Sequence, residues 1–498
     1  MPPTPLPRST PEAQGVPSRA IREFLSAVAA DGQELHSIML LRHGHVIAEG
    51  WWTPFAPTLP HELFSVSKSF TATAVGIAIN EGLLGLDDRV VDLLPDDAPG
   101  EVSESLQAMR VRHLLAMNTG HAEDTLVALH SPERNWARAI LRRPVENPPG
   151  GAFVYNTGAT YLLSAIMQRL TGQRLLDYLT PRLFQPLGIE GATWERCPRG
   201  IDVGGWGLAI TTEDLAKFGQ LYLQRGQWNG VQLVPAVWAD AVHERHVSNG
   251  DPREDDDWTQ GYGYQFWLCR HGAYRADGAF GQLAIVMPEQ DAVLALTSAL
   301  NDTAAVVTAA WDQLLEGLST PAPLPENPAG RAELSAALAG LAIAQPAGSA
   351  VSPMAASVSG RDYDLAPNIA HLEGVRVVFA ADRAELTLRD EAGEHRIDCG
   401  LGAWITGTAA VPEAGSFRRT RRAAVAASGA WADESTFVAR LQVYETPIAL
   451  LVELAFSADE VTVRLSQNVS FGPTELARSA GVARDPHHPA ATEARQAE

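Results

Sequence analysis

A serine and a lysine three residues apart open an apolar stretch of the sequence. Ser65 and Lys68 lie in the run FSVSKS (residues 64–69), and the apolar residues that follow predict a buried helix over 70–79. Because positions i and i+3 share one face of a helix, the Ser65 hydroxyl and the Lys68 amine can meet. A serine hydroxyl becomes a nucleophile when a base takes its proton, and a lysine whose pKa is lowered by burial can be that base.

The scarcity of lysine adds weight to this pair. The chain contains two lysines, Lys68 and Lys217, beside 36 arginines. A GC-rich genome explains the excess of arginine, but arginine cannot replace a catalytic lysine because it does not lose its proton in proteins. The alternative is that Ser65 caps the helix and Lys68 is an exposed side chain.

Two further stretches could complete a nucleophilic site. In FVYNTG (residues 153–158), Tyr155 precedes a helix that begins at Ala159, and a neighbouring cation would lower the pKa of its phenol for proton transfer. In ADGAFGQ (residues 276–282), glycines lead into an apolar strand, where a backbone N–H could pair with the N–H of Ser65 as an oxyanion hole. The alternatives are a buried core tyrosine and an ordinary glycine-rich turn.

Composition narrows the class of protein. The 498 residues are 46% hydrophobic and 19% charged, with a net charge of −21, which disfavours nucleic acid and anionic membranes as partners. The three cysteines, at 197, 269 and 399, form no CxxC motif and predict neither a disulfide framework nor a cysteine zinc site. No apolar run reaches about 18 residues and no signal peptide is visible, so we expect a cytoplasmic protein without membrane spans.

The order of the elements predicts an α+β domain over residues 11–318. Strands occur at both ends, in hairpins over 36–52 and 283–296, with helices between them, so the terminal segments are expected to share one antiparallel sheet. A loose leader is expected over 1–10 and a proline-rich linker with a short helix over 319–344. Short alternating strands predict a β-barrel or sandwich over 345–477, followed by a disordered tail over 478–498.

Several common catalytic motifs are missing from the sequence. It contains no GxSxG, no P-loop and no complete HExxH; HERH at 243–246 is one residue short and is interpreted as a solvated helix end. His121 is expected at the surface. We therefore predict neither a metal ion nor a cofactor.

The order and spacing of these motifs resemble the serine β-lactamase/penicillin-binding-protein superfamily, in its class C β-lactamase-related (CubicO-type) branch. The resemblance covers about residues 10–318 and includes GLLGLDDRV (82–90), VRHLLAMNTG (111–120), GGWGL (204–208), TTEDLA (211–216) and GYGY (261–264). It implies a β-lactamase-like domain, in which an antiparallel sheet is flanked by helices and joined by a helical subdomain. Several members also carry a C-terminal lipocalin-like barrel.

The resemblance assigns roles by position. Ser65 would be the acylated nucleophile, Lys68 its partner and Tyr155 the proton shuttle, with the N–H groups of Ser65 and Ala279 as the oxyanion hole. The substrate-binding positions would be Thr157, Ala276, Asp277 and Gly278. Two of them depart from the family: Thr157 stands where asparagine is usual, and Ala276 replaces the lysine or histidine that helps to hold a substrate carboxylate.

We therefore predict a metal-independent serine hydrolase that acts on small carboxylic esters or amides. The alternatives are a D-amino-acid-type peptidase or amidase and a β-lactamase, the last disfavoured by the missing cation at Ala276. A different class is a slowly acylating binding or sensor protein, which would be labelled at Ser65 without turnover. The sequence leaves open whether the chain forms a homo-oligomer.

Overall fold

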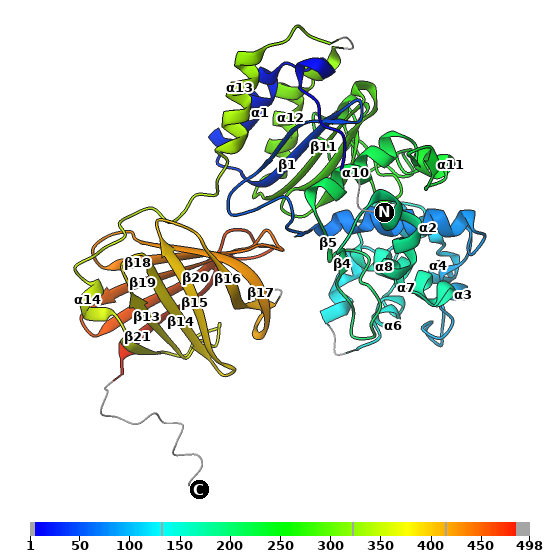
Figure 1. Cartoon of the computed structure of the whole chain (residues 1–498). Coiled ribbons are helices and arrows are strands. Elements are labelled where there is room, and N and C mark those ends of the chain that lie inside the picture. The colour runs from blue at the N-terminus through cyan, green and yellow to red at the C-terminus, as the bar shows by residue number, and fades with distance from the viewer. Residues whose placement is uncertain (1–4, 131–132, 321–322, 414–415, 485–498) are drawn as a thin grey trace. The chain divides into compact units, whose positions relative to one another are not determined.

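The computed structural model describes residues 5–130, 133–320, 323–413 and 416–484. The chain divides into two compact units, Met1–Leu341 and Ala342–Glu498 (Figure 1). Each unit has its own apolar core. The fold of each follows from how its strands and helices bury their apolar faces.

A six-stranded antiparallel sheet forms the centre of the first unit, in the order β2-β1-β11-β10-β9-β8. Its strands are β1 (Glu34–Arg42), β2 (His45–Trp51), β8 (Trp267–Leu268), β9 (Tyr274–Gly278), β10 (Gln282–Met287) and β11 (Ala292–Ala299). The N-terminal strand β1 lies beside the late strand β11, with Ile38 opposite Leu296. The prediction that the terminal segments share one antiparallel sheet is confirmed.

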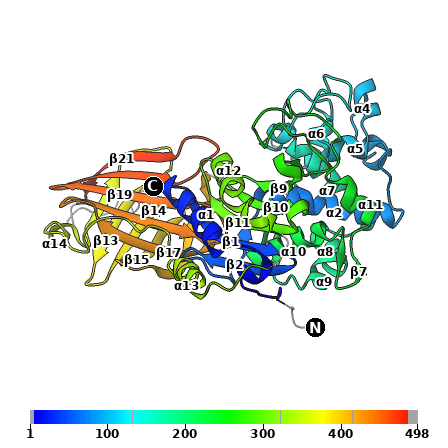
Figure 2. The same cartoon turned by 90° about the horizontal axis from the view of Figure 1, so that it is seen from above.

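Helices cover both faces of this sheet. On one face, α1 (Ser18–Ala30) and α12 (Thr303–Leu314) lie side by side and bury Phe24 and Trp311 against the alternating apolar residues of β1 and β11 (Figure 2). On the other face, α10 (Thr212–Leu223) packs against β10 and β11. The central strands β10 and β11 are therefore buried on both sides, which is why they read as continuous apolar runs.

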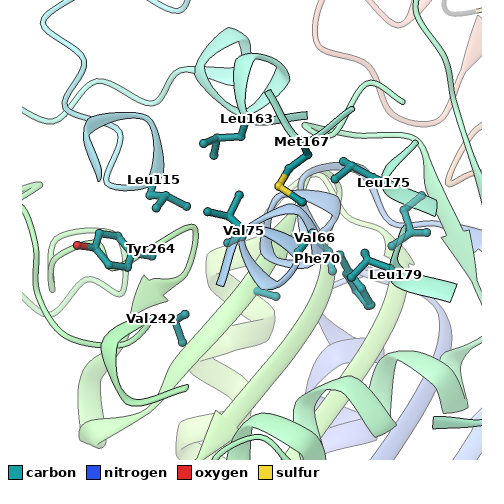
Figure 3. Packing of buried hydrophobic residues seen from close by; sticks show 14 of the residues in the cluster. Val66, Phe70, Val75, Leu115, Leu163, Met167, Leu175, Leu179, Val242 and Tyr264 are labelled. Atoms are coloured by element: carbon teal, nitrogen blue, oxygen red, sulfur yellow. The ribbon is translucent and has the colours of Figure 1, made fainter. Parts of the chain in front are cut away.

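Helix α2 (Ser67–Asn80) is the buried centre of the helical region. Its residues from Ser67 to Ala78 are all buried, because the helix is apolar or small-polar on every side. Figure 3 shows Phe70 and Val75 surrounded by side chains from neighbouring helices, including Leu163 and Met167 of α7 (Thr157–Thr171). Burying a phenylalanine stabilises a fold by about 2–3 kcal/mol, so this packing fixes α2 firmly.

The described part of the first unit contains several shorter elements around this core. The short helices include α3 (Val90–Leu93), α4 (Glu104–Ala108), α5 (Val111–Leu115), α6 (Trp136–Leu141), α8 (Leu175–Leu179), α9 (Gln185–Leu187) and α11 (Ala236–Ala241). The short strands are β3 (His61–Glu62), β4 (Thr193–Trp194), β5 (Leu208–Ile210), β6 (Gln227–Trp228) and β7 (Val231–Gln232). Strand β3 pairs with β5 and leads directly into the run that contains Ser65.

The segments expected as leader and linker both pack against the first unit, and the short helix predicted within 319–344 is present. The described part of the leader, residues 5–10, is ordered against β2: the Val46 N–H donates to the Pro7 carbonyl, and Arg8 pairs with Glu49 and Glu213. The expected linker over 319–344 contains α13 (Pro328–Ala339), which packs against α1 within the first unit. Apolar and ionic contacts to distant residues hold both segments, and local composition does not reveal such contacts.

The second unit is a closed β-barrel. Nine of its described strands form a ring in the order β15-β14-β13-β12-β21-β20-β19-β18-β17, closed by parallel pairing of β15 with β17, while β16 adds to β17 alone. Their bounds are β12 (Asp362–Leu365), β13 (Gly374–Phe379), β14 (Arg383–Asp390), β15 (Gly393–Leu401), β16 (Ile405–Glu413), β17 (Ser416–Trp431), β18 (Thr436–Val443), β19 (Ala449–Ser457), β20 (Glu460–Gln467) and β21 (Glu475–Ala483), with a short helix α14 (Ala355–Val358).

The barrel is filled by alternate side chains of its strands. Trp431, Phe437 and Phe456 meet in its core, as the alternating burial along β18 and β19 requires. Of the two folds predicted for this region, the barrel is the one observed. Strand β21 runs to Ala483, so the start of the expected tail at 478 is wrong, and residues 485–498 lie outside the described part of the chain. Throughout the described residues, no helix is long and apolar enough to span a membrane.

Candidate active site

Ser65 lies at the point where a strained turn enters α2. It belongs to a 3-10 turn over Phe64–Val66, and Phe64 has a φ of +46°, in the left-handed region that residues with side chains rarely adopt. Such a conformation costs roughly 1–2 kcal/mol and persists only where the surrounding structure holds it. The turn leaves the Ser65 side chain partly exposed, whereas the helix behind it is buried.

Lys68 lies one helical turn further on and is 1% exposed. Its Nζ donates hydrogen bonds to Ser65 Oγ and to the Gly205 carbonyl oxygen, each at 2.8 Å. Burial lowers the pKa of Lys68 to about 7, while the negative charges of Asp124 and Asp277 oppose this decrease. A substantial fraction of Lys68 is therefore neutral near pH 7 and able to accept the Ser65 proton.

Gly205 is a site residue that the sequence analysis did not identify. A side-chain carbon at this position would lie 2.8 Å from Thr157 Cγ2, which is too close, and 3.7 Å from Lys68 Nζ, which is ordinary contact, so a larger residue would crowd Thr157 beside the lysine. The backbone carbonyl of Gly205 orients the amine toward Ser65. The glycine pair in GGWGL was the available signal, but it indicated family membership and not this contact.

Tyr155 lies beside the serine and the lysine. Lys68 Nζ is 4.9 Å from the centre of the Tyr155 ring, and the Tyr155 hydroxyl shares a hydrogen bond with Ser65. The ring stacks on Trp267 with their centres 5.6 Å apart. The expectation that a cation lowers the pKa of this phenol is not met: burial raises it, and the bond with Ser65 opposes the increase only in part. Tyr155 therefore stays protonated near neutral pH and acts as a hydrogen-bond donor.

The residues after Tyr155 organise the site from behind. The Asn156 side chain accepts from the Ala159 N–H and caps α7. Thr157 is buried, and its N–H donates to Asp124 Oδ1 at 2.8 Å, so its contact with substrate remains a prediction. His121 is buried in this network and is not at the surface, contrary to expectation.

The end of strand β9 lies against the chain just before Ser65. A side-chain carbon at Gly278 would overlap the carbonyl oxygen of Leu63, so only glycine allows this approach. The Phe64 and Phe280 rings meet edge to face with their centres 5.5 Å apart. These residues flank Ser65 and Ala279, the two positions whose N–H groups are predicted to form the oxyanion hole, and so bring those positions to one place.

Ala276 and Asp277, two of the positions predicted to bind substrate, have different surroundings. Ala276 is fully buried in the apolar core opposite Ala284, so its side chain is placed for packing, which differs from the predicted role in binding substrate. Asp277 points to the other face of β9, where its Oδ2 accepts from Arg275 Nε at 2.7 Å. Strand alternation, which separates Ala276 from its neighbours, explains the difference.

Metal-ligating residues are not gathered in the described part of the chain. No group of three or more His, Cys, Asp or Glu side chains there is arranged to hold a metal ion. In HERH, both histidines share hydrogen bonds with backbone carbonyls, His243 with Ala239 and His246 with Ala241. This run therefore contributes to packing at the end of α11.

Comparison with known proteins shows the family to which the chain belongs. A family model described as Beta-lactamase matches residues 26–319. The 6-aminohexanoate-dimer hydrolase of Paenarthrobacter ureafaciens is 27% identical over 307 residues, which are 57% of this chain and 76% of that protein. Penicillin-binding protein 4 of Amycolatopsis lactamdurans is 27% identical over 252 residues, 44% of this chain and 65% of that protein.

The solved structures include proteins with a related fold. The structure of EstCE1, a hydrolase with promiscuous acyltransferase activity, is 17% identical, covers 59% of this chain and 98% of its own, and gives a TM-score of 0.50. A likeness at this level of identity concerns the fold of the first unit.

Proposed function

Because the chain belongs to the Beta-lactamase family, we propose that it is a serine hydrolase that cleaves small carboxylic esters or amides through an acyl-enzyme on Ser65. The observation that carries the proposal is the 2.8 Å hydrogen bond between Lys68 Nζ and Ser65 Oγ, made by a lysine that burial brings to a pKa of about 7. A nucleophile and a base within hydrogen-bond reach are the minimum equipment for acyl transfer.

Acylation follows from the positions of the three side chains. Neutral Lys68 takes the Ser65 proton as Oγ attacks the substrate carbonyl carbon, and the N–H groups of Ser65 and Ala279 stabilise the oxyanion. As the C–O or C–N bond breaks, a proton from the Lys68 ammonium reaches the leaving group through the Tyr155 hydroxyl. A water molecule then attacks the acyl carbon and gives a proton to neutral Lys68, and as the acyl C–Oγ bond breaks the Lys68 ammonium returns that proton to Ser65 Oγ.

The choice between ester and amide depends on leaving-group protonation. An amine leaving group must be protonated before it departs, and Tyr155 stays protonated near neutral pH, which suits that task. The name of the 27% identical relative, a 6-aminohexanoate-dimer hydrolase, also supports amide hydrolysis. The buried Ala276 offers no cation for a substrate carboxylate, which disfavours β-lactams and carboxylate-terminated peptides.

Labelling with a fluorophosphonate probe, together with turnover of a p-nitrophenyl ester, tests the proposal. The unaltered protein should be labelled at Ser65 and should turn over the ester, whereas Ser65→Ala should lose both, with a decrease in kcat of about 10⁴-fold or more. Ser67→Ala is a matched control, because the Ser67 hydroxyl accepts a hydrogen bond from the Leu208 N–H and does not face Lys68. Equal turnover by Ser65→Ala would refute the proposal, and labelling without turnover would indicate a slowly acylating sensor.

A further inference from the structure

The ion pair at the end of strand β9 has a buried positive end and a more accessible negative end. Arg275 is completely buried, whereas the Asp277 side chain keeps 13% of its surface exposed, and Arg275 Nε lies 2.7 Å from Asp277 Oδ2. A molecule that approaches this end of the strand therefore meets the carboxylate before the guanidinium. The ion pair has a net charge of zero, but a substrate is closer to its negative charge than to its positive charge.

Several contacts fix the guanidinium in this position. It lies 4.2 Å from the ring centre of Trp258, and its Nη1 donates to the Asp257 carbonyl at 2.9 Å and to Cys269 Sγ at 3.0 Å. Arg275 is also 5.6 Å from the centre of Trp267, the ring that stacks on Tyr155. Because Arg275 is held on several sides, it holds the Asp277 carboxylate in one orientation.

Asp277 lies next to the reacting group that the proposed function requires. It lies near the end of β9 and precedes Ala279, the first residue of the turn that follows this strand, by two residues. Strand β8 pairs with β9 at Arg275 and Tyr274, and in the described sheet this pairing does not extend to Asp277. On that side Asp277 therefore has no partner in β8, and β9 also packs against the turn Phe64–Val66, which contains Ser65. Asp277 also acts electrostatically on both Lys68 and Tyr155, which places its charge close to them.

A second carboxylate and a row of aromatic rings surround the same site. Asp124 is partly exposed on the opposite, helical side and is held by the Thr157 N–H. Phe153, Tyr155 and Trp267 are partly exposed and pack against one another. Carboxylates and aromatic faces both attract cations and repel or fail to bind anions.

From this arrangement we propose that Asp277, held by Arg275, is a specificity-determining residue that makes the site prefer esters or amides bearing an ammonium group over neutral ones, and neutral ones over carboxylates. The inference rests on the proposed function, because it concerns the substrate of the same acyl-enzyme. Burial raises the pKa of Asp277, and the adjacent guanidinium opposes that increase, so the preference weakens when acid protonates the carboxylate.

Three p-nitrophenyl esters of equal chain length test the proposal, with acyl chains that end in trimethylammonium, tert-butyl or carboxylate. The first two groups have nearly the same shape, so their comparison isolates charge. With the full-length protein, we expect kcat/KM to fall by about tenfold from the ammonium to the tert-butyl ester and by about tenfold again to the carboxylate ester, with smaller ratios at high salt.

Two substitutions at Asp277 separate charge from structure. Asp277→Asn keeps an acceptor for Arg275 and should bring the three esters within about threefold, while Asp277→Glu should retain the preference. Asp92→Asn, which removes an exposed carboxylate from α3, is the charge-matched control and should change nothing. A circular dichroism spectrum and melting curve for each variant establish that it is folded.

Each outcome separates this inference from the proposed function. Ser65-dependent hydrolysis of the tert-butyl ester with equal rates for all three esters would overturn the role of Asp277 and leave the hydrolase intact. An ammonium preference that survives in folded Asp277→Asn would also overturn it and assign the preference to Asp124. Hydrolysis that does not depend on Ser65 would refute the proposed function, and this inference with it.

Discussion

The first turn of α2 and the middle of α10 each bury one of the two lysines of the chain. Lys68 is 1% exposed and Lys217 is 3% exposed, so the two side chains are equally removed from water. Their partners differ. The Lys217 amine lies 3.7 Å from Asp214 Oδ1, whereas the Lys68 amine donates to two neutral oxygens, those of Ser65 and Gly205.

This difference separates a structural lysine from a chemical one. A carboxylate beside a buried amine gives the charge of that amine a partner of opposite sign in the protein interior. An amine that is buried among neutral dipoles gains less from its charge than it loses in hydration, and its pKa falls. Burial is nearly the same in α2 and α10, so the partners of the two amines are what distinguish these lysines.

The largest test of this comparison is to replace each lysine by arginine. Lys68→Arg keeps a positive charge and removes the base, so kcat/KM for a p-nitrophenyl ester should fall by about 10³-fold or more. Lys217→Arg should remain within a few fold of the unaltered protein, since Asp214 needs only a cation. Parallel kinetics of the two variants provide the measurement.

Either of two results would contradict the assignment. Near-normal turnover in Lys68→Arg would show that the lysine only positions Ser65. An equal loss in folded Lys217→Arg would show that both helices contribute to catalysis and that the partner does not distinguish them.

The sequence predicted the features of the site that depend on local geometry. Ser65 and Lys68 meet because i and i+3 share a helix face, and this holds wherever the helix packs. The sheet built from both ends of the first unit was also predictable, because its strands carry strong apolar patterns and the order of elements leaves few topologies. These signals lie in a short window of sequence.

Features that depend on distant contacts could not be predicted in the same way. The Gly205 carbonyl reaches Lys68 across 137 positions of sequence, and the raised pKa of Tyr155 depends on burial by several segments. Arg275 and Asp277 are two residues apart, but the sequence does not show that Arg275 holds Asp277 beside the site. Closure of the C-terminal barrel depends on the pairing of β15 with β17, for which no local pattern exists.

A second test exchanges each lysine for methionine and measures stability at pH 7. The pKa of Lys68 is near 10.5 in the unfolded chain and about 7 in the folded protein. The unfolded state therefore binds the proton more tightly, and burial of this amine destabilises the fold at neutral pH. Lys68→Met should therefore stabilise the protein by about 2 kcal/mol, after the lost bond to Gly205 is counted. Lys217→Met leaves Asp214 buried without its cation and should destabilise by about 2 kcal/mol or more.

Scanning calorimetry measures both changes in the free energy of unfolding. The expected signs are opposite, with stabilisation by Lys68→Met and destabilisation by Lys217→Met. Between pH 7 and 10.5 the unfolded state binds more protons at Lys68 than the folded state does, so the free energy of unfolding of the unaltered protein should rise with pH in this range. Lys68→Met should lack this rise. Destabilisation by both methionine variants would mean that Lys68 is as structural as Lys217.

The smallest expected effect concerns the pH dependence of catalysis. Since neutral Lys68 is the base, kcat/KM should rise with pH, with a midpoint near 7. Asp124 raises the pKa of Lys68 by its negative charge, so Asp124→Asn should move the midpoint to lower pH while Asn keeps the acceptor for the Thr157 N–H. Rates across pH 5–9 for both proteins check this.

A midpoint that does not move, or that moves upward, would show that the ionisation seen in the rate belongs to another group. A downward shift would show that the carboxylates near Lys68 adjust its pKa without pairing with it, which is what distinguishes it from Lys217.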